Sequence, residues 1–122
     1  MAKKILIVDD IDFILKFEEE ILKKLATELQ ASFEVDMAHN VKEALDYIKD
    51  KHYDIMIVDM HLPDGSGLDI AKALKAQNIN TAIAVLSLYP EKEETQQYFN
   101  MILKKPITPS LYKKAIQQLL SL

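Results

Sequence analysis

The sequence has no cysteine and no arginine. Without cysteine there is no disulfide framework, no thiolate zinc site and no thiol nucleophile, which is compatible with a reducing compartment. Without arginine, all 15 basic residues are lysines, so no bidentate guanidinium can recognise phosphate groups or guanine edges. The net charge of -4 also argues against direct binding of nucleic acid or of anionic membranes.

Long apolar runs are absent as well. Nothing approaches the roughly 18 consecutive apolar residues of a transmembrane helix, and the run in MAKKILIVDD is far too short for a signal peptide. We therefore expect a soluble, cytoplasmic protein that does not bind membranes. The length of 122 residues is near the commonest size of one domain, so we expect a single domain over residues 1–122.

Short apolar runs alternate with segments of helical periodicity. The runs predict strands at Ile5–Val8, Phe33–Met37, Ile55–Val58, Ala82–Leu86 and Met101–Leu103. The periodic segments predict helices whose buried stripes are Ile14, Phe17, Ile21, Leu25 and Leu29; Val41, Ala44, Leu45 and Ile48; Ile70, Ala71 and Leu74; and Leu111, Ala115 and Leu119. Five alternations predict an α/β fold, with a doubly wound parallel sheet and helices on both faces.

Capping residues indicate where two of these helices begin. Asn40 with Glu43 three residues later, and Thr108 followed by Pro109, are typical of helix starts. The segment Glu91–Gln97 contains no apolar residue, so a helix there is expected to be the most loosely held.

Carboxylates follow two of the predicted strands. Asp9 and Asp10 end the first strand, and Asp59 ends the third. In a doubly wound sheet, side chains at the carboxyl ends of neighbouring strands converge in one crevice. If these two strands are adjacent, three carboxylates share a pocket, and a divalent cation relieves their repulsion; hard oxygen ligands on a small rigid site suit Mg²⁺. Asp10 is also expected to cap the helix that begins near Ile11.

A hydroxyl and a lysine follow the last two strands. The fourth strand ends near Ser87, and the fifth ends in Lys104, Lys105 and Pro106. A cation, a lysine, a hydroxyl and a nucleophilic carboxylate around one point are the groups needed to accept a phosphoryl group. We therefore predict that Asp59 is phosphorylated.

These residues resemble a known family. The acidic pair in ILIVDD, the run IVDMHLPDGSG, the hydroxyl in AVLSL and the lysine-proline pair in LKKPI are similar to the receiver domain of two-component response regulators, over the whole chain. The resemblance implies the flavodoxin-like and CheY-like fold, a five-stranded sheet of order 2-1-3-4-5. It also implies a bacterial signalling protein that is not an enzyme, apart from Mg²⁺-dependent phosphorylation and dephosphorylation of itself.

The resemblance further implies a role for each site residue. Asp59 accepts a phosphoryl group from a histidine kinase or phosphotransfer protein, Lys105 pairs with that group, and Ser87 moves in to hydrogen-bond it. The implied ligands of Mg²⁺ are Asp10, Asp59, the backbone carbonyl of His61 and, through water, Asp9.

Two positions depart from the family pattern. Leu88 stands where receivers usually carry a small residue, and we expect it to restrict access to the site. Ile102 stands where they usually carry an aromatic ring that turns inward on activation. The switch is therefore expected to depend on Ser87 and the following helix, with an effector or homodimer face around Tyr89, Tyr98 and the last helix.

Two alternative functions stay open. A pseudo-receiver would keep the fold as a protein-binding module without the phosphoryl chemistry. A haloacid-dehalogenase-like phosphatase would use Asp10-Ile11-Asp12 as its nucleophile motif, although this leaves Asp59 unexplained. Detection of an aspartyl phosphate, and of the residue that carries it, separates the three functions.

Overall fold

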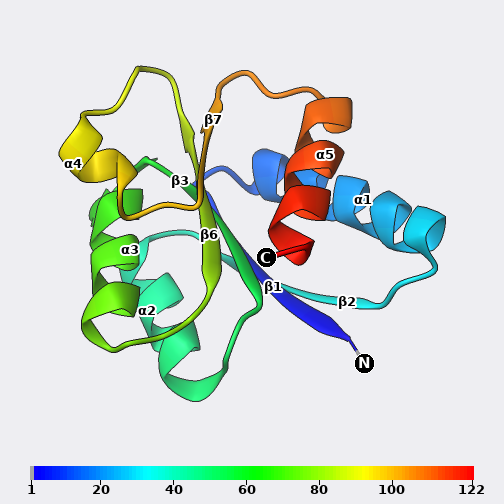
Figure 1. Cartoon of the computed structure of the whole chain (residues 1–122), viewed down its shortest axis with the longest axis horizontal. Helices are drawn as coiled ribbons and strands as arrows, with labels where there is room; N and C mark the ends of the chain where they lie inside the picture. Colours follow the sequence, from blue (N-terminus) through cyan, green and yellow to red (C-terminus); the bar gives the residue numbers. More distant parts are fainter. Residues whose placement is uncertain (1) are drawn as a thin grey trace.

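A central parallel sheet lies between two layers of helices (Figure 1) in the computed structural model, which describes residues 2–122. Its five strands, in chain order, are β1 (Lys3–Val8), β2 (Phe33–Ala38), β3 (Ile55–Asp59), β6 (Ala82–Ser87) and β7 (Met101–Lys104). Their spatial order is β2-β1-β3-β6-β7, all pairs being parallel. The predicted strands and the 2-1-3-4-5 order are confirmed.

Helices cover both faces of this sheet. They are α1 (Asp12–Leu29), α2 (Val41–Asp50), α3 (Gly67–Ala76), α4 (Glu93–Gln96) and α5 (Pro109–Leu120). Figure 1 shows α1 and α5 on one face, and α2 and α3 on the other. Apolar side chains form a core cluster beneath each pair, and β3 between them is buried along its whole length. No helix within residues 2–122 has both the length and the apolarity to cross a membrane.

The buried face of α1 is rotated from the predicted stripe. Phe17 and Leu29 are 41% and 39% exposed, whereas Leu15 and Leu22 are fully buried. Apolar residues occur on adjacent sides of this helix, so spacing alone left two overlapping stripes possible. The prediction for Phe17 and Leu29 is wrong, because docking of α1 against the sheet and α5 buries the neighbouring stripe. In α5 the predicted Leu111 is likewise exposed.

The predicted helix caps are present. The Asn40 side chain accepts a hydrogen bond from the backbone N–H of Glu43 at 2.7 Å, and α2 begins at the next residue. Thr108 Oγ1 accepts one from the backbone N–H of Leu111 at 3.2 Å, with Pro109 in the first turn of α5.

The helix expected to be loosest is the shortest. Instead of the segment Glu91–Gln97, α4 comprises only Glu93–Gln96 and buries none of its residues. Its anchor is the following aromatic residue Tyr98, whose ring lies 5.7 and 4.9 Å from the ammonium groups of Lys72 and Lys75 in α3. The helix α4 is therefore held in place mainly by the contacts of Tyr98 with α3, and not by burial of its own side chains.

A small hairpin that was not predicted connects β3 to α3. Strands β4 (His61–Leu62) and β5 (Gly65–Ser66) pair antiparallel. The carboxylate of Asp64, in its turn, accepts hydrogen bonds from two backbone N–H groups at the start of α2, at 2.8 and 3.0 Å. These two hydrogen bonds hold the hairpin, which directly follows Asp59, against the start of α2.

Candidate functional site

Three carboxylates meet at the carboxyl ends of β1 and β3. Because these strands are neighbours in the sheet, Asp9, Asp10 and Asp59 each place a carboxylate oxygen within 4.8 Å of the other two. Asp9 and Asp59 are buried and Asp10 is exposed. Like charges this close repel strongly in a partly buried site, so the cluster has the oxygen donors and the negative charge that a hard divalent cation requires.

Asp9 and Asp10 differ in their contacts. Asp9 Oδ1 accepts a hydrogen bond from the backbone N–H of Ile11, the N-cap residue of α1, at 2.9 Å. The prediction that Asp10 caps this helix is therefore wrong, because the N-cap position is Ile11 and no side chain caps the helix. The carboxylate of Asp9 binds the backbone of Ile11, and Asp10 contributes to the cluster. Burial raises the pKa of Asp9, and the nearby Asp59 carboxylate raises it further, although the Ile11 N–H opposes this.

Lys105 brings the opposing charge. Its ammonium nitrogen lies 2.8 Å from Asp59 Oδ1, and its backbone N–H donates to the carbonyl of Ser87 at 2.9 Å. The Lys105–Pro106 peptide bond is cis. Lys105 follows β7, which lies beyond β6 from the strand that carries Asp59, and its neighbour Lys104 is exposed. One cation at hydrogen-bond distance partly compensates three carboxylates.

Ser87 ends β6, and the hydrogen bonds of its side chain go to the loop that follows rather than to Asp59. Its hydroxyl is buried and donates to the Glu91 carboxylate at 2.6 Å, with the backbone carbonyl of Tyr89 at 2.9 Å. The sequence analysis placed Ser87 near the site but missed Glu91. No sequence pattern indicates which residue of a loop will hydrogen-bond to the end of the preceding strand.

A glycine keeps the Asp59 backbone close to α3. The N–H of Gly67 donates to the carbonyl of Met60 at 2.9 Å. A Cβ at Gly67 would lie 2.9 Å from the Asp59 carbonyl oxygen and 2.9 Å from a methyl group of Val58, which is closer than real Cβ atoms come. His61, two residues after Asp59, directs its N–H toward Asp59 Oδ1 at 3.4 Å.

An apolar cavity of about 470 Å³ adjoins the cluster. Its walls come from the start of α1, the end of β6 and the loop before α5, and its lining residues are Asp9, Ile11, Phe13, Ile14, Phe17, Glu18, Leu86, Leu88, Lys105, Pro106, Ile107 and Tyr112. Leu88 is half-exposed at this cavity. This position of Leu88 is consistent with the prediction that it lies beside the site. Ile102 lies on the exposed side of β7.

Glu18 is a buried acid in the wall of this cavity. It is 4% exposed, and the buried Tyr112 of α5 donates its hydroxyl to Glu18 Oε1 at 2.6 Å. Desolvation raises the pKa of Glu18 to about 8, and the charges of Asp9 and Asp59 act in the same direction. Sequence reasoning missed this residue, although it falls on the same helical stripe as the buried Leu15 and Leu22.

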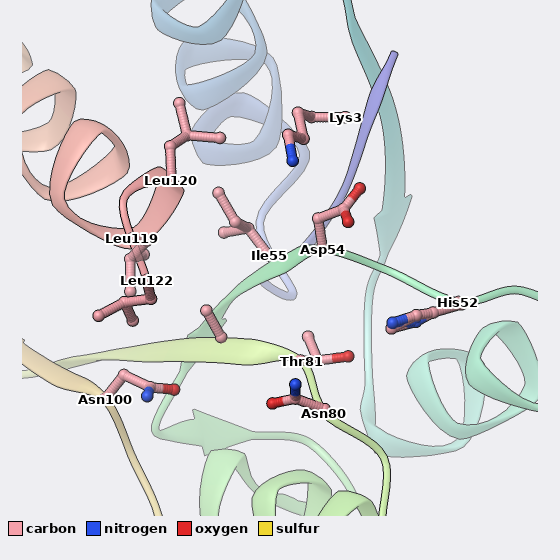
Figure 2. Close-up of a pocket in the computed structure, with 11 residues that line it drawn as sticks. Lys3, His52, Asp54, Ile55, Asn80, Thr81, Asn100, Leu119, Leu120 and Leu122 are labelled. Atoms are coloured by element: carbon pink, nitrogen blue, oxygen red, sulfur yellow. The ribbon is translucent and has the colours of Figure 1, made fainter. Parts of the chain in front are cut away.

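A second cavity, of about 310 Å³, lies at the opposite edge of the sheet, where the strands begin (Figure 2). Its polar residues already bind backbone groups: Asp54 accepts from the N–H of Lys4 at 2.8 Å, and Thr81 donates to the carbonyl of Tyr53 at 2.7 Å. These two hydrogen bonds connect the segments that precede β3 and β6 to neighbouring backbone, and neither of them pairs a nucleophile with a base.

Comparison with known proteins assigns the chain to a family. Residues 5–117 match the family model of the response regulator receiver domain. Response regulator protein PilR of Pseudomonas aeruginosa is 33% identical over 87 residues, which cover 71% of this chain and 18% of that protein. The aerobic respiration control sensor protein ArcB of Escherichia coli is 29% identical over 113 residues, covering 88% of this chain and 14% of ArcB. The chain thus spans less than a fifth of either relative.

Solved structures show the same fold. A CheY-like response regulator receiver domain protein from Methanospirillum hungatei has a TM-score of 0.80 at 26% identity, covering 99% of this chain and 96% of that one. Response regulator protein TrrA from Thermotoga maritima, solved in complex with Mg(2+)-BeF, has a TM-score of 0.79 at 27% identity, covering 97% of this chain and 99% of that one.

Proposed function

The chain belongs to the response regulator receiver domains of two-component systems, and we propose that it accepts a phosphoryl group on Asp59. One observation carries this choice of residue. Asp59 is a buried carboxylate that sits in an acidic cluster and has a lysine ammonium, that of Lys105, 2.8 Å from one oxygen. Asp10 is exposed, and among residues 2–122 the ion pair with a lysine in this cluster is made by Asp59 and not by Asp10.

The reaction we propose is an in-line phosphoryl transfer. A carboxylate oxygen of Asp59 attacks the phosphorus of a phosphohistidine on a histidine kinase or phosphotransfer protein. The new O–P bond makes an acyl phosphate, the N–P bond breaks, and the imidazole leaves and takes up a proton. Lys105 then shifts from the Asp59 oxygen to a phosphoryl oxygen, and Ser87 can donate its hydroxyl to another.

The acidic cluster fits Mg²⁺. Carboxylate and carbonyl oxygens are its preferred ligands, and the proposed set is Asp10, Asp59 and the backbone carbonyl of His61. Asp9 is assigned a water-mediated contact because one of its oxygens already accepts from the Ile11 N–H. Bound Mg²⁺ would neutralise charge on the phosphoryl oxygens during transfer. The similar TrrA protein was solved in complex with Mg(2+)-BeF, which supports Mg²⁺ as the cation proposed here.

The output is proposed to leave through the segment after Ser87. Tyr89 is 69% exposed, and α4 buries no residue, so this part of the surface is the least costly to rearrange. We propose that an effector or a second copy of the chain contacts Tyr89, Tyr98 and α5.

Phosphorylation at Asp59 is tested by chemical trapping. The protein is incubated with a small-molecule phosphodonor and Mg²⁺, the acyl phosphate is reduced with borohydride, and the modified residue is mapped by mass spectrometry. We expect the label on Asp59 and its loss in Asp59→Asn. The matched control is Asp12→Asn, because Asp12 is exposed and pairs with His39 at 2.7 Å, outside the cluster.

Two results would overturn the proposal. A label on Asp10 or Asp12 would favour the dehalogenase-like chemistry. No label from the small donor, and none from a panel of histidine kinases, would favour a pseudo-receiver that binds partners without phosphorylation.

A further inference from the structure

The Ser87 hydroxyl is engaged by a carboxylate. Its oxygen lies 2.6 Å from Glu91 Oε2 and 2.9 Å from the Tyr89 carbonyl oxygen. A hydroxyl has one proton to donate, and hydrogen bonds to a carboxylate are shorter and stronger than those to a neutral carbonyl. Glu91 is therefore the principal acceptor of the Ser87 proton.

The backbone of Ser87 has little freedom to move. It ends β6, its carbonyl accepts from the Lys105 N–H at 2.9 Å, and the preceding residue, Leu86, is paired with Asp59 across the sheet. Ser87 is 2% exposed. Any change in what the hydroxyl contacts must therefore come from side-chain rotation and from movement of the loop that carries Glu91.

A phosphoryl group on Asp59 and the Glu91 carboxylate would compete for the same proton. Both are anionic acceptors, and both lie next to the end of β6. We propose that Glu91 is a positioning residue that acts as an inhibitory latch: it holds the Ser87 hydroxyl away from the phosphorylation site, and the phosphorylated form must break this bond. This inference rests on the proposed function, since it needs a phosphoryl group at Asp59.

The latch also connects Ser87 to α4. The carbonyl of Glu91 accepts a hydrogen bond from the side-chain amide of Gln96 at 2.8 Å, and Gln96 ends the single turn of α4. Release of the Glu91 carboxylate removes one of the hydrogen bonds between this loop and the end of β6, where the Ser87 hydroxyl also contacts the backbone of Tyr89. Because this chain has Ile102 where receivers usually carry an aromatic ring, the proposed link between the phosphorylation site and the loop before α4 is the Glu91 carboxylate.

The latch is tested with beryllofluoride, a phosphoryl mimic, in the presence of Mg²⁺. Affinities are measured by fluorine NMR for the wild type, Glu91→Ala, Ser87→Ala and the double variant. Because a hydrogen bond to a charged group has to be broken, we expect Glu91→Ala to tighten beryllofluoride binding about ten-fold. In the Ser87→Ala background the same substitution should change the affinity less than about two-fold, since the two residues act through one bond.

Two further variants separate the bond from charge and from folding. Glu93→Ala removes the same charge from an exposed position of α4 with no hydrogen bond to Ser87, and we expect it to leave the affinity unchanged. Glu91→Gln keeps the side-chain length and an acceptor oxygen but loses the charge, so its affinity should lie between those of the wild type and Glu91→Ala.

The outcomes distinguish the latch from the phosphorylation site. Equal effects of Glu91→Ala and Glu93→Ala, or an undiminished effect of Glu91→Ala in the Ser87→Ala background, would overturn the latch and leave the proposed function standing. Failure of the wild type to bind beryllofluoride with Mg²⁺ would overturn the proposed function and the latch with it.

Discussion

Replacing the buried acid Glu18 by glutamine should stabilise the protein above neutral pH. Glu18 is enclosed between α1 and α5, and the described structure gives it one hydrogen bond, from the Tyr112 hydroxyl at 2.6 Å. Asp9 and Asp59 face it as like charges, and Lys105 is the compensating cation. Glutamine has nearly the same shape, its carbonyl oxygen can accept from Tyr112, and it cannot ionise.

The size of the effect follows from proton linkage. The pKa of Glu18 is raised from 4.5 to about 8, chiefly by desolvation. Between these two values the folded protein keeps a proton that the unfolded chain loses, so the free energy of unfolding falls as the pH rises, by about 1.4 kcal/mol per pH unit. Over the whole window this amounts to about 5 kcal/mol, a large part of the roughly 5–15 kcal/mol that stabilises a typical domain.

Urea unfolding at about pH 5 and about pH 8, without divalent cations, measures this term. We expect Glu18→Gln to lie close to the wild type at the lower pH and to be more stable by several kcal/mol at the higher one. Because both proteins contain Asp9, its own raised pKa largely cancels in the difference. Glu20→Gln is the matched control, because it makes the same chemical change on the exposed side of α1 and so isolates the effect of burial. A pH-independent difference for Glu18→Gln would refute the reasoning.

Two further predictions concern the proposed phosphorylation site. Asp10→Asn should weaken Mg²⁺ binding by about ten-fold or more, and by more than Asp9→Asn, because Asp10 is assigned a direct contact and Asp9 a water-mediated one; equal titration curves for the two variants would contradict this order. Leu88→Ala should speed phosphorylation by a small-molecule donor and leave Mg²⁺ affinity unchanged, since Leu88 lines the cavity beside Lys105 and is not itself a proposed ligand. A rate that is unaltered or slower would show that Leu88 does not restrict the site.

The sheet and most of the site were open to prediction because their determinants are local. The apolar run Ile55–Val58 marks a strand buried on both faces, and Asn40 and Thr108 mark helix starts through bonds that span three residues. The carboxyl ends of parallel strands always share one edge, so placing Asp9, Asp10 and Asp59 after strands brought them together as soon as β1 and β3 were taken as neighbours. The resemblance to receiver domains supplied that order.

Docking of the helices was beyond sequence reasoning. Glu18 stands in a run of three glutamates that reads as a solvated face, and only the approach of Tyr112 from α5, 94 positions later, turns it into a buried acid. Phe17 was expected inside and is 41% exposed, because a helix with apolar residues on adjacent sides can bury either one. The choice depends on contacts between elements, and these have no periodicity along the chain.

What the sequence alone determined is thus the set of chemical groups at the edge of the sheet, since their positions follow from where each strand ends. The partner of each group depends instead on contacts between distant parts of the folded chain. Lys105 pairs with Asp59, Asp9 takes the backbone of Ile11, and Ser87 binds Glu91 in the loop beyond it. Such pairings depend on the path of loops and on side-chain rotation, where differences of an ångström select one hydrogen-bond acceptor over another.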